Sequence, residues 1–235
     1  MNKTVLITGA SKGIGLATAR EFLTNEPTVS DIIMLARESD HFIENVKWLE
    51  TLNDRGVRIH TYNVDLGDRQ QIIAAMAEIN AAHPKVDILV NNAGYTNPVA
   101  FQQVEFEDFE KTIMVNVYAP FTVIQELLHH GNKFDAIVNI ASTAGITGRA
   151  GWLTYSASKA AVINMSDVLR EELAIYGTRV VSLSPGRCAT DLRKTLAPDE
   201  DPSTIMQPEH VASIVRTMVS GVGQYLDSAN LVVRQ

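Results

Sequence analysis

The sequence predicts an α/β protein whose parallel sheet is covered by helices on both faces. Short runs rich in β-branched residues alternate along the chain with longer stretches in which apolar residues recur at helical spacing. This alternation predicts a doubly wound parallel sheet. The strand-like runs are mostly apolar rather than alternating, as in Ile137-Val138-Asn139-Ile140, which is typical of strands buried on both faces. We therefore expect three layers, with about seven strands in the middle one.

The predicted elements follow one another without a linker or an internal repeat, so one domain over residues 1–235 is expected. Strands are expected at Thr4–Thr8, Asp31–Leu35, Arg58–Tyr62, Val86–Asn91, Ala136–Ile140, Arg179–Ser184 and Asn230–Val233. Helices are expected at Ile14–Leu23, Phe42–Arg55, Gln70–Ala82, Phe106–His130, Tyr155–Tyr176 and Glu209–Ser220. The stretch Asp191–Gln207 has no clear periodicity. Long stretches of this kind in compact domains are often functional, and we expect a short substrate lid at about 191–207.

Composition and charge exclude several classes of function. A net charge of -7 argues against binding to nucleic acid or to an anionic membrane surface, since both require clustered Lys and Arg. One cysteine, Cys188, cannot form an intramolecular disulfide or a multi-cysteine metal site, and His129-His130 is expected to be solvated at a helix end, so no metal is expected. No apolar run approaches a membrane span, and Met1 leads directly into a strand-like run without a signal peptide. The expected location is cytoplasmic.

A glycine-rich turn follows the first predicted strand. It reads Thr8-Gly9-Ala10-Ser11-Lys12-Gly13-Ile14-Gly15, and a helix is expected to begin there. Glycines at such a junction allow backbone N–H groups to approach a pyrophosphate at a helix N-terminus. The strict G-x-G-x-x-G pattern is not met, because Thr18 stands three residues after Gly15. The position after the first strand of an alternating chain nevertheless favours a nucleotide site.

The end of the second predicted strand indicates which nucleotide is preferred. Proteins that bind NAD tend to place an acidic residue there, whereas a nearby Arg accommodates the 2′-phosphate of NADP. Here the strand ends Leu35-Ala36-Arg37, and Lys12 in the glycine turn could reach the same phosphate. The sequence therefore predicts NADP(H) in preference to NAD(H).

Further motifs occur in a fixed order along the whole chain. After the glycine turn come Asn91-Asn92-Ala93-Gly94, Asn116, Ser142, Tyr155-x3-Lys159 and Pro185-Gly186 with Thr190. This ordered set resembles the short-chain dehydrogenase/reductase family, of the type with an Asn-Ser-Tyr-Lys tetrad. The resemblance implies a Rossmann-type domain that transfers a hydride between a nicotinamide cofactor and a carbonyl or alcohol carbon. Unlike many members, this sequence ends Val232-Val233-Arg234-Gln235 without an Asp-Gly-Gly tail.

The resemblance assigns roles to particular residues. It implies that Asp65 contacts adenine, that Asn91 to Gly94 close over the adenosine side, and that Pro185-Gly186 and Thr190 hold the nicotinamide. With the two cations, the residues expected to bind the cofactor are Gly9, Ser11, Lys12, Gly13, Ile14, Gly15, Arg37, Asp65, Leu66, Asn92, Ala93, Gly94, Tyr155, Lys159, Pro185, Gly186 and Thr190. The implied catalytic residues are Asn116, Ser142, Tyr155 and Lys159.

The chemistry of carbonyl reduction fits the expected tetrad. The carbonyl carbon takes a hydride and its oxygen takes a proton, which Tyr155 would supply. A Tyr hydroxyl has a pKa near 10, and Lys159, on the same helical face four residues later, would lower it. Ser142 would stabilise charge on the substrate oxygen, and the resemblance implies that Asn116 holds a water that links Lys159 to solvent.

Three functions follow from these residues. The first is an NADP(H)-dependent reductase of small carbonyl compounds, or the reverse alcohol dehydrogenase. The second is a reductase of a phosphorylated sugar or of an acyl-carrier-bound intermediate, because Arg149, Arg187, Arg193 and Lys194 could meet an anionic substrate. The third is a non-catalytic NADP(H)-binding regulator. A homodimer or homotetramer is expected through the two longest predicted helices, although their apolar stripe (Ile113, Val117, Phe121, Ile124 and Leu128) could instead face the protein's own sheet.

Overall fold

The computed structural model describes residues 2–226 and 230–235. Met1 and residues 227–229, which the expected single domain includes, lie outside the described residues. In the part of the chain that the structure describes, no helix is both long and apolar enough to cross a membrane.

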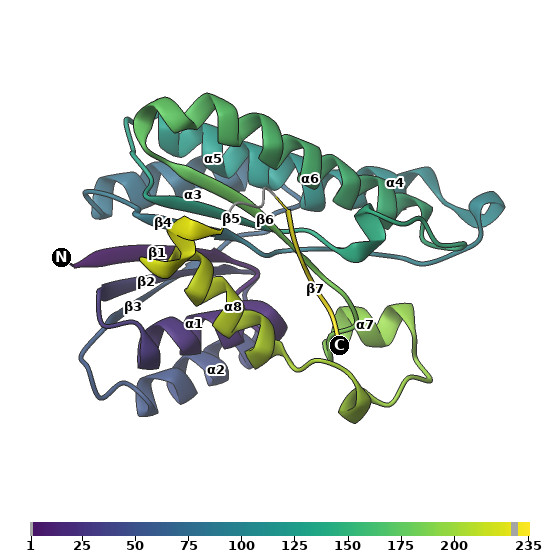
Figure 1. Ribbon diagram of the computed structural model, residues 1–235, viewed down its shortest axis with the longest axis horizontal. Helices are drawn as coiled ribbons and strands as arrows, with labels where there is room; N and C mark the ends of the chain where they lie inside the picture. The colour runs from purple at the N-terminus through teal and green to yellow at the C-terminus, as the bar shows by residue number, and fades with distance from the viewer. Residues whose placement is uncertain (1, 227–229) are drawn as a thin grey trace.

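Seven parallel strands form one sheet in the order β3-β2-β1-β4-β5-β6-β7 (Figure 1). Their bounds are β1 Lys3–Thr8, β2 Val29–Ala36, β3 Arg58–Asn63, β4 Ile88–Asn91, β5 Ala136–Ile140, β6 Arg179–Pro185 and β7 Asn230–Val233. The order reverses between β1 and β4, where the chain connections leave in opposite directions. Open sheets of this kind bind ligands in the crevice at the carboxyl ends of their strands near such a reversal.

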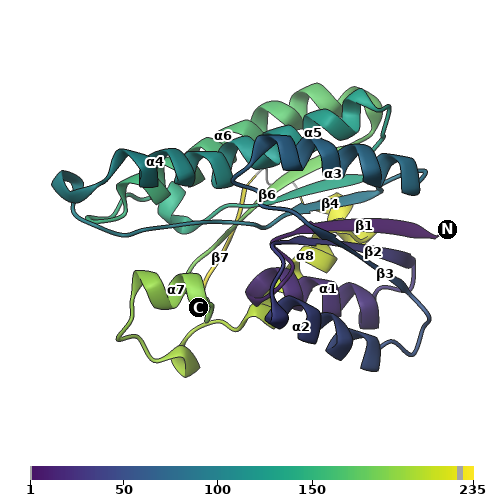
Figure 2. The ribbon, with the colours of Figure 1, turned by 180° about the vertical axis from the view of Figure 1, so that it is seen from behind.

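Helices cover both faces of the sheet, as Figures 1 and 2 show from opposite sides. One face carries α1 (Gly13–Asn25), α2 (Asp40–Thr51) and α8 (Pro208–Val219). The other carries α3 (Arg69–Ala82), α4 (Phe106–Ile113), α5 (Ala119–His129) and α6 (Leu153–Leu173). The short helix α7 (Asp191–Leu196) lies beside the carboxyl end of β7, next to the C-terminus in both views. The predicted three-layer α/β fold is confirmed.

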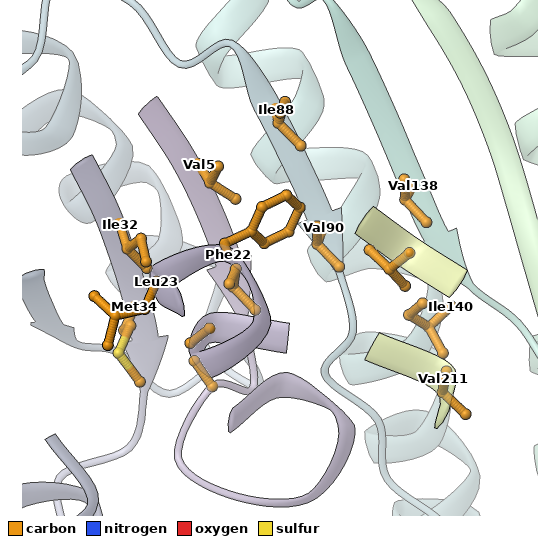
Figure 3. Packing of buried hydrophobic residues seen from close by; sticks show 14 of the residues in the cluster. Val5, Phe22, Leu23, Ile32, Met34, Ile88, Val90, Val138, Ile140 and Val211 are labelled. Carbon is orange, nitrogen blue, oxygen red and sulfur yellow. The ribbon is translucent and has the colours of Figure 1, made fainter. Parts of the chain in front are cut away.

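Each face of the sheet has its own hydrophobic core. Because neighbouring residues of a strand point to opposite faces, Ile32 and Met34 pack under α1, while Ile33 and Leu35 pack under α3 and α5. Figure 3 shows the first core, in which Phe22 of α1 and Val211 of α8 lie over the central strands. The rigid double-sided core fixes where the strand ends lie.

Several predicted elements end a few residues from their bounds in the structure, and two local predictions differ in kind. The expected helix Phe106–His130 is divided by a π-helical turn, Met114–Tyr118, between α4 and α5. A π turn adds one residue per turn, and such turns occur often at functional sites. The stretch without periodicity at 191–207 begins with a real helix, α7, whose first turn is capped by the hydroxyl of Thr190, which accepts from the N–H of Arg193. Six residues are too few to show a helical period in the sequence.

Candidate active site

A cavity of about 590 Å³ lies at the carboxyl ends of the central strands. It is lined by the glycine turn after β1, by Ala36 at the end of β2 and Arg37 after it, and by the segments that follow β4, β5 and β6. All the residues predicted for cofactor binding or catalysis line it except Gly15 and Asn116, which lie behind its wall. The fold therefore brings together motifs that lie as far apart as Gly9 and Thr190.

The glycines of the turn are required by backbone geometry. Gly9 and Gly13 have φ values of 63° and 57°, the left-handed region that favours glycine. A Cβ on Gly15 would overlap the carbonyl oxygen of Gly9 and lie 2.5 Å from Nδ2 of Asn92. Gly15 therefore acts by letting α1 approach the strand ends closely, which explains why it is buried behind the cavity wall.

The N-terminus of α1 is suited to a pyrophosphate. Its N-cap residue, Lys12, makes no side-chain capping hydrogen bond, and the first turn contains no acidic residue. By contrast, α2 and α3 are capped by the side chains of Ser39 and Asp68. The first N–H groups of a helix need an acceptor, and those of α1 adjoin the lining residues Gly13 and Ile14. This end of the cavity fits the dinucleotide that the sequence predicts.

The adenosine end of the cavity contains the residues expected to select the cofactor. Ala36 and Arg37 both line it, and Arg37 is exposed. Asp65 also lines it, while its Oδ1 accepts from the N–H of Gly67 at 2.8 Å. Lys12 also lines it, and its ammonium forms a 2.6 Å ion pair with Asp191 at the start of α7, so the expected contact with the 2′-phosphate stays a prediction. The pair links the glycine turn to the segment expected to be a lid.

Tyr155 lies in the first turns of α6, and its side chain is buried. Burial raises the pKa of Tyr155, and a hydrogen bond with Ser142 and the charge of Arg193 lower it less than burial raises it. Ser142 follows β5, and its Oγ also accepts from the N–H of Ala144 at 3.1 Å. Removal from water is therefore the larger effect on the pKa of Tyr155 in this structure, and the expected lowering by Lys159 stays a prediction. The phenol is therefore held in its protonated form at neutral pH.

Lys159 is buried one helical turn after Tyr155, and its exposed fraction is 4 %. Its Nζ donates to the carbonyl oxygen of Ile140 at 2.7 Å and lies 5.9 Å from the centroid of the Tyr155 ring. Burial lowers the pKa of Lys159 to about 8. The chain can approach this helix because Gly145 lacks a Cβ, which would lie 2.6 Å from the Lys159 carbonyl carbon.

Asn116 lies in the π turn between α4 and α5 and does not reach the large cavity. Its Oδ1 accepts from the N–H of Tyr95 at 2.7 Å, and its Nδ2 donates to the Tyr95 carbonyl and to Oγ of Ser158, both at 2.9 Å. A second cavity of about 10 Å³ is lined by both Asn116 and Lys159. That volume is close to the space one water needs, so the expected water link to Lys159 stays a prediction.

The opposite end of the cavity contains cations that the sequence indicated only in part. Arg149, Arg187 and Arg193 line it, whereas Lys194 does not. Tyr95, Lys111, Arg234 and Gln235 are among the further lining residues that sequence reasoning missed. The last two follow β7, so the rule that parallel strands end at one edge could have indicated them. Nothing in the sequence marks Tyr95 or Lys111, which tertiary packing brings to the site.

Two other groups of polar side chains lie outside the predicted chemistry. Cys188 is buried, which raises its pKa to about 12, and this fits the expected role of a small packing residue.

Asp31, His60 and His83 bring potential metal-ligand atoms within 4.8 Å of one another on the β2–β3 side of the sheet. Asp31 already accepts two 2.7 Å hydrogen bonds from Arg58, so its charge is balanced.

Comparison with known proteins agrees with this site. The family model described as short chain dehydrogenase matches residues 3–201. An acetoacetyl-CoA reductase of Acinetobacter sp. (strain RA3849) is 30% identical over 241 residues, covering 98% of this chain and 96% of the relative. A 3-oxoacyl-acyl-carrier-protein reductase of Thermotoga maritima is 30% identical over 235 residues, covering 95% of this chain and 93% of the relative.

Solved structures give the same result. The crystal structure of a blue fluorescent protein from a metagenomic library, in complex with NADPH, superposes with a TM-score of 0.86 at 28% identity. The match covers 98% of this chain and 96% of that one. The fold and the site thus define an α/β oxidoreductase of the Rossmann type. The chain belongs to the short-chain dehydrogenase family.

Proposed function

We propose that the chain is an NADP(H)-dependent carbonyl reductase in which Tyr155 donates the proton. The observation that carries this proposal is the buried Tyr155 beside Ser142 and Lys159, in one cavity with the N-terminus of α1, which has no side-chain cap. A non-catalytic binding protein has no need of this arrangement. The relatives named as reductases of acetoacetyl-CoA and of 3-oxoacyl-acyl-carrier-protein support the same reaction type.

The residues present would divide the reaction as follows. When bound, the reduced nicotinamide supplies the hydride that reaches the carbonyl carbon. Ser142 holds the carbonyl oxygen, and the hydroxyl of Tyr155 gives that oxygen its proton, so that the products are the alcohol and the oxidised cofactor. The positive charge of Lys159 favours the phenolate that remains and allows it to be reprotonated. The raised pKa of Tyr155 suits the direction of reduction, which starts from the protonated phenol.

Preference for NADP(H) rests on the end of β2. Arg37 follows the buried Ala36 and is exposed at the cavity, where its guanidinium can form bidentate hydrogen bonds with a 2′-phosphate. β2 ends in Ala36 rather than in the acidic residue that NAD-binding folds tend to place there for the ribose 2′-hydroxyl, and the next carboxylate, Glu38, does not line the cavity. The NADPH bound in the blue fluorescent protein supports the proposal.

Replacing Tyr155 by Phe tests the proposed function. The variant loses one hydroxyl and keeps the ring that fills the site, so we expect turnover to fall by about 100-fold or more. NADPH affinity, measured by titration calorimetry, should change little because the cofactor's phosphates bind elsewhere. Retention of carbonyl-dependent NADPH oxidation by Tyr155→Phe would refute Tyr155 as the proton donor.

We also propose that the protein is a homo-oligomer that pairs through α4, α5 and α6. The apolar stripe expected on this segment is divided: Ile124 is buried against the sheet, whereas Phe121 is 47% exposed. Tyr118 beside it, and Leu153 and Val168 of α6, are exposed as well. Sedimentation equilibrium of the chain and of Phe121→Glu tests this, and a monomer for the unmodified chain would contradict it.

A further inference from the structure

The charge of the large cavity is opposite to that of the whole chain. The chain carries a net charge of -7, yet among the residues that the structure describes eight Lys or Arg side chains line the cavity against two Asp side chains. Lys12 and Arg37 lie at the adenosine end, and Lys159 belongs to the catalytic group. The remaining five cations are Lys111, Arg149, Arg187, Arg193 and Arg234. A cofactor whose phosphates lie at the adenosine end does not neutralise these five charges.

The protein's own carboxylates balance these cations only in part. Glu200 forms a bidentate pair with Arg193, with oxygens 2.6 and 2.7 Å from Nε and Nη2, and the same carboxylate lies 3.3 Å from Arg187. One negative charge is therefore shared by two guanidinium groups. Among residues 2–226 and 230–235, no carboxylate lies within 4.0 Å of Arg149. An exposed Arg needs no partner by itself, but this one lines a cavity that already has excess positive charge.

Trp152 holds two of these cations close to the reacting group. The guanidinium carbon of Arg149 lies 5.2 Å from the centroid of the Trp152 ring, and that of Arg193 lies 5.7 Å from it. Stacking of this kind orients a guanidinium and restricts its motion. Trp152 also precedes Tyr155 by three residues, and the charge of Arg193 acts on the hydroxyl of Tyr155. Because Glu200 already pairs with Arg193, an anion would be held mainly by Arg149, on the same Trp152 ring and close to the proton donor Tyr155.

We propose that the substrate is a small ketone or aldehyde that carries an anionic group, a phosphate or a carboxylate, and that Arg149 is the main contact of that group. This inference rests on the proposed reductase function. The substrate is small because the 590 Å³ cavity must also hold the dinucleotide, and the large apolar side chains that line it beside Arg149 and Arg193 are Trp152, Leu192 and Leu196.

Matched pairs of substrates test the inference with the whole enzyme and NADPH. Ribulose 5-phosphate is compared with ribulose, dihydroxyacetone phosphate with dihydroxyacetone, and acetoacetate with its ethyl ester. We expect the charged member of at least one pair to have a kcat/KM about 30- to 100-fold higher, as charge-assisted hydrogen bonds provide. The phosphate and carboxylate pairs show which anion is recognised.

Variants of Arg149 locate the preference. Arg149→Ala should raise KM for the charged member about 10- to 30-fold and leave kcat and the uncharged member nearly unchanged. Arg149→Lys should restore part of the loss, since it keeps the charge and loses the bidentate fork. Lys194→Ala is the matched control, because Lys194 lies on α7 and does not line the cavity.

The possible failures are distinct. Equal kcat/KM values within every pair, or a preference for acetoacetyl-CoA over all the small ketones, would overturn the inference and leave the reductase function standing. Carbonyl-dependent NADPH oxidation that is absent with every compound would overturn both. An anion preference that survives Arg149→Ala would refute the role given to Arg149.

Discussion

The two ends of the cavity are built in different ways. At the adenosine end, each functional group lies in the few residues that directly follow one strand: the glycine turn after β1, Arg37 after β2, and Asp65 after β3. At the substrate end, the groups depend on contacts between distant segments, as in the stacking of Arg193 on Trp152. The first end is therefore governed by local backbone geometry, and the second by long-range packing and burial.

Burial at the substrate end predicts the largest effect, that of Lys159→Met. Turnover should fall by about 100-fold or more, since the variant loses the charge that supports proton transfer at Tyr155. The pKa of Lys159 is about 8 in the folded chain, below its ordinary value of 10.5. Below pH 8 Lys159 is protonated in both the folded and the unfolded chain. The folded chain then bears the full cost of the buried charge, about 3 kcal/mol.

The stability of this variant should depend on pH in a definite direction. Between about pH 8 and 10.5 the folded chain releases the proton of Lys159 while the unfolded chain keeps it, so wild-type stability rises with pH. Lys159→Met lacks the titrating group and therefore this rise of stability with pH. The free energy of unfolding is measured with urea at pH 7 and at pH 10 for both proteins. From pH 7 to pH 10 it should increase by up to about 3 kcal/mol more in the wild type than in the variant. A difference that is independent of pH would mean that Lys159 is not buried as a cation.

Backbone geometry at the adenosine end predicts the next effect, that of Gly15→Ala. The added Cβ meets backbone of Gly9 and the amide of Asn92, which themselves pair through a 3.1 Å hydrogen bond, so α1 must move away. We expect a loss of about 1–3 kcal/mol in the free energy of unfolding, together with weaker NADPH binding. Gly221→Ala is the control, because nothing lies within 4 Å of its added Cβ. Equal thermal stability of the two variants would contradict the close approach.

The same contrast explains what the sequence could predict. The alternation of strands and helices predicts the three layers, and the turn after β1 predicts a nucleotide site, because both depend on patterns within a few residues. Tyr155, Ser142 and Asn116 could be named only through the resemblance to a family, since the pattern Tyr-x3-Lys is common in helices. The raised pKa of Tyr155 could not be foreseen, because it depends on how deeply the folded chain buries the hydroxyl.

The ion pair of Lys12 shows the same limit of local patterns. Lys12 and Asp191 are separated by 179 positions, and no sequence pattern relates them. Likewise, the π turn at Asn116 interrupts a stretch whose apolar spacing predicts one continuous helix. Long-range pairs of this kind determine how the predicted motifs are combined.

Arg37→Ala tests whether the adenosine end selects NADPH through Arg37. If Arg37 binds the 2′-phosphate, the variant should raise the KM for NADPH about tenfold and leave that for NADH unchanged, which is the loss expected for one charge-assisted hydrogen bond. Steady-state kinetics with both cofactors measure this. Lys47→Ala, an exposed change on α2 away from the cavity, is the control. Equal losses with NADPH and NADH would show that Arg37 does not select the cofactor.

The smallest effect is expected for Asp191→Asn. Asp191 links α7 to the glycine turn through its ion pair with Lys12. Asp191 holds the ammonium of Lys12 at 2.6 Å, in a pair whose side chains are 55% and 70% exposed. An exposed pair contributes at most about 1 kcal/mol, so the change in KM for NADPH should be within about fivefold. If Lys12 binds a cofactor phosphate, Asp191→Asn frees Lys12 and should lower the KM for NADPH, whereas Lys12→Ala should raise it. If Lys12 serves only to fasten α7, both variants should instead raise the KM together, and trypsin should cut the segment 191–207 faster in each.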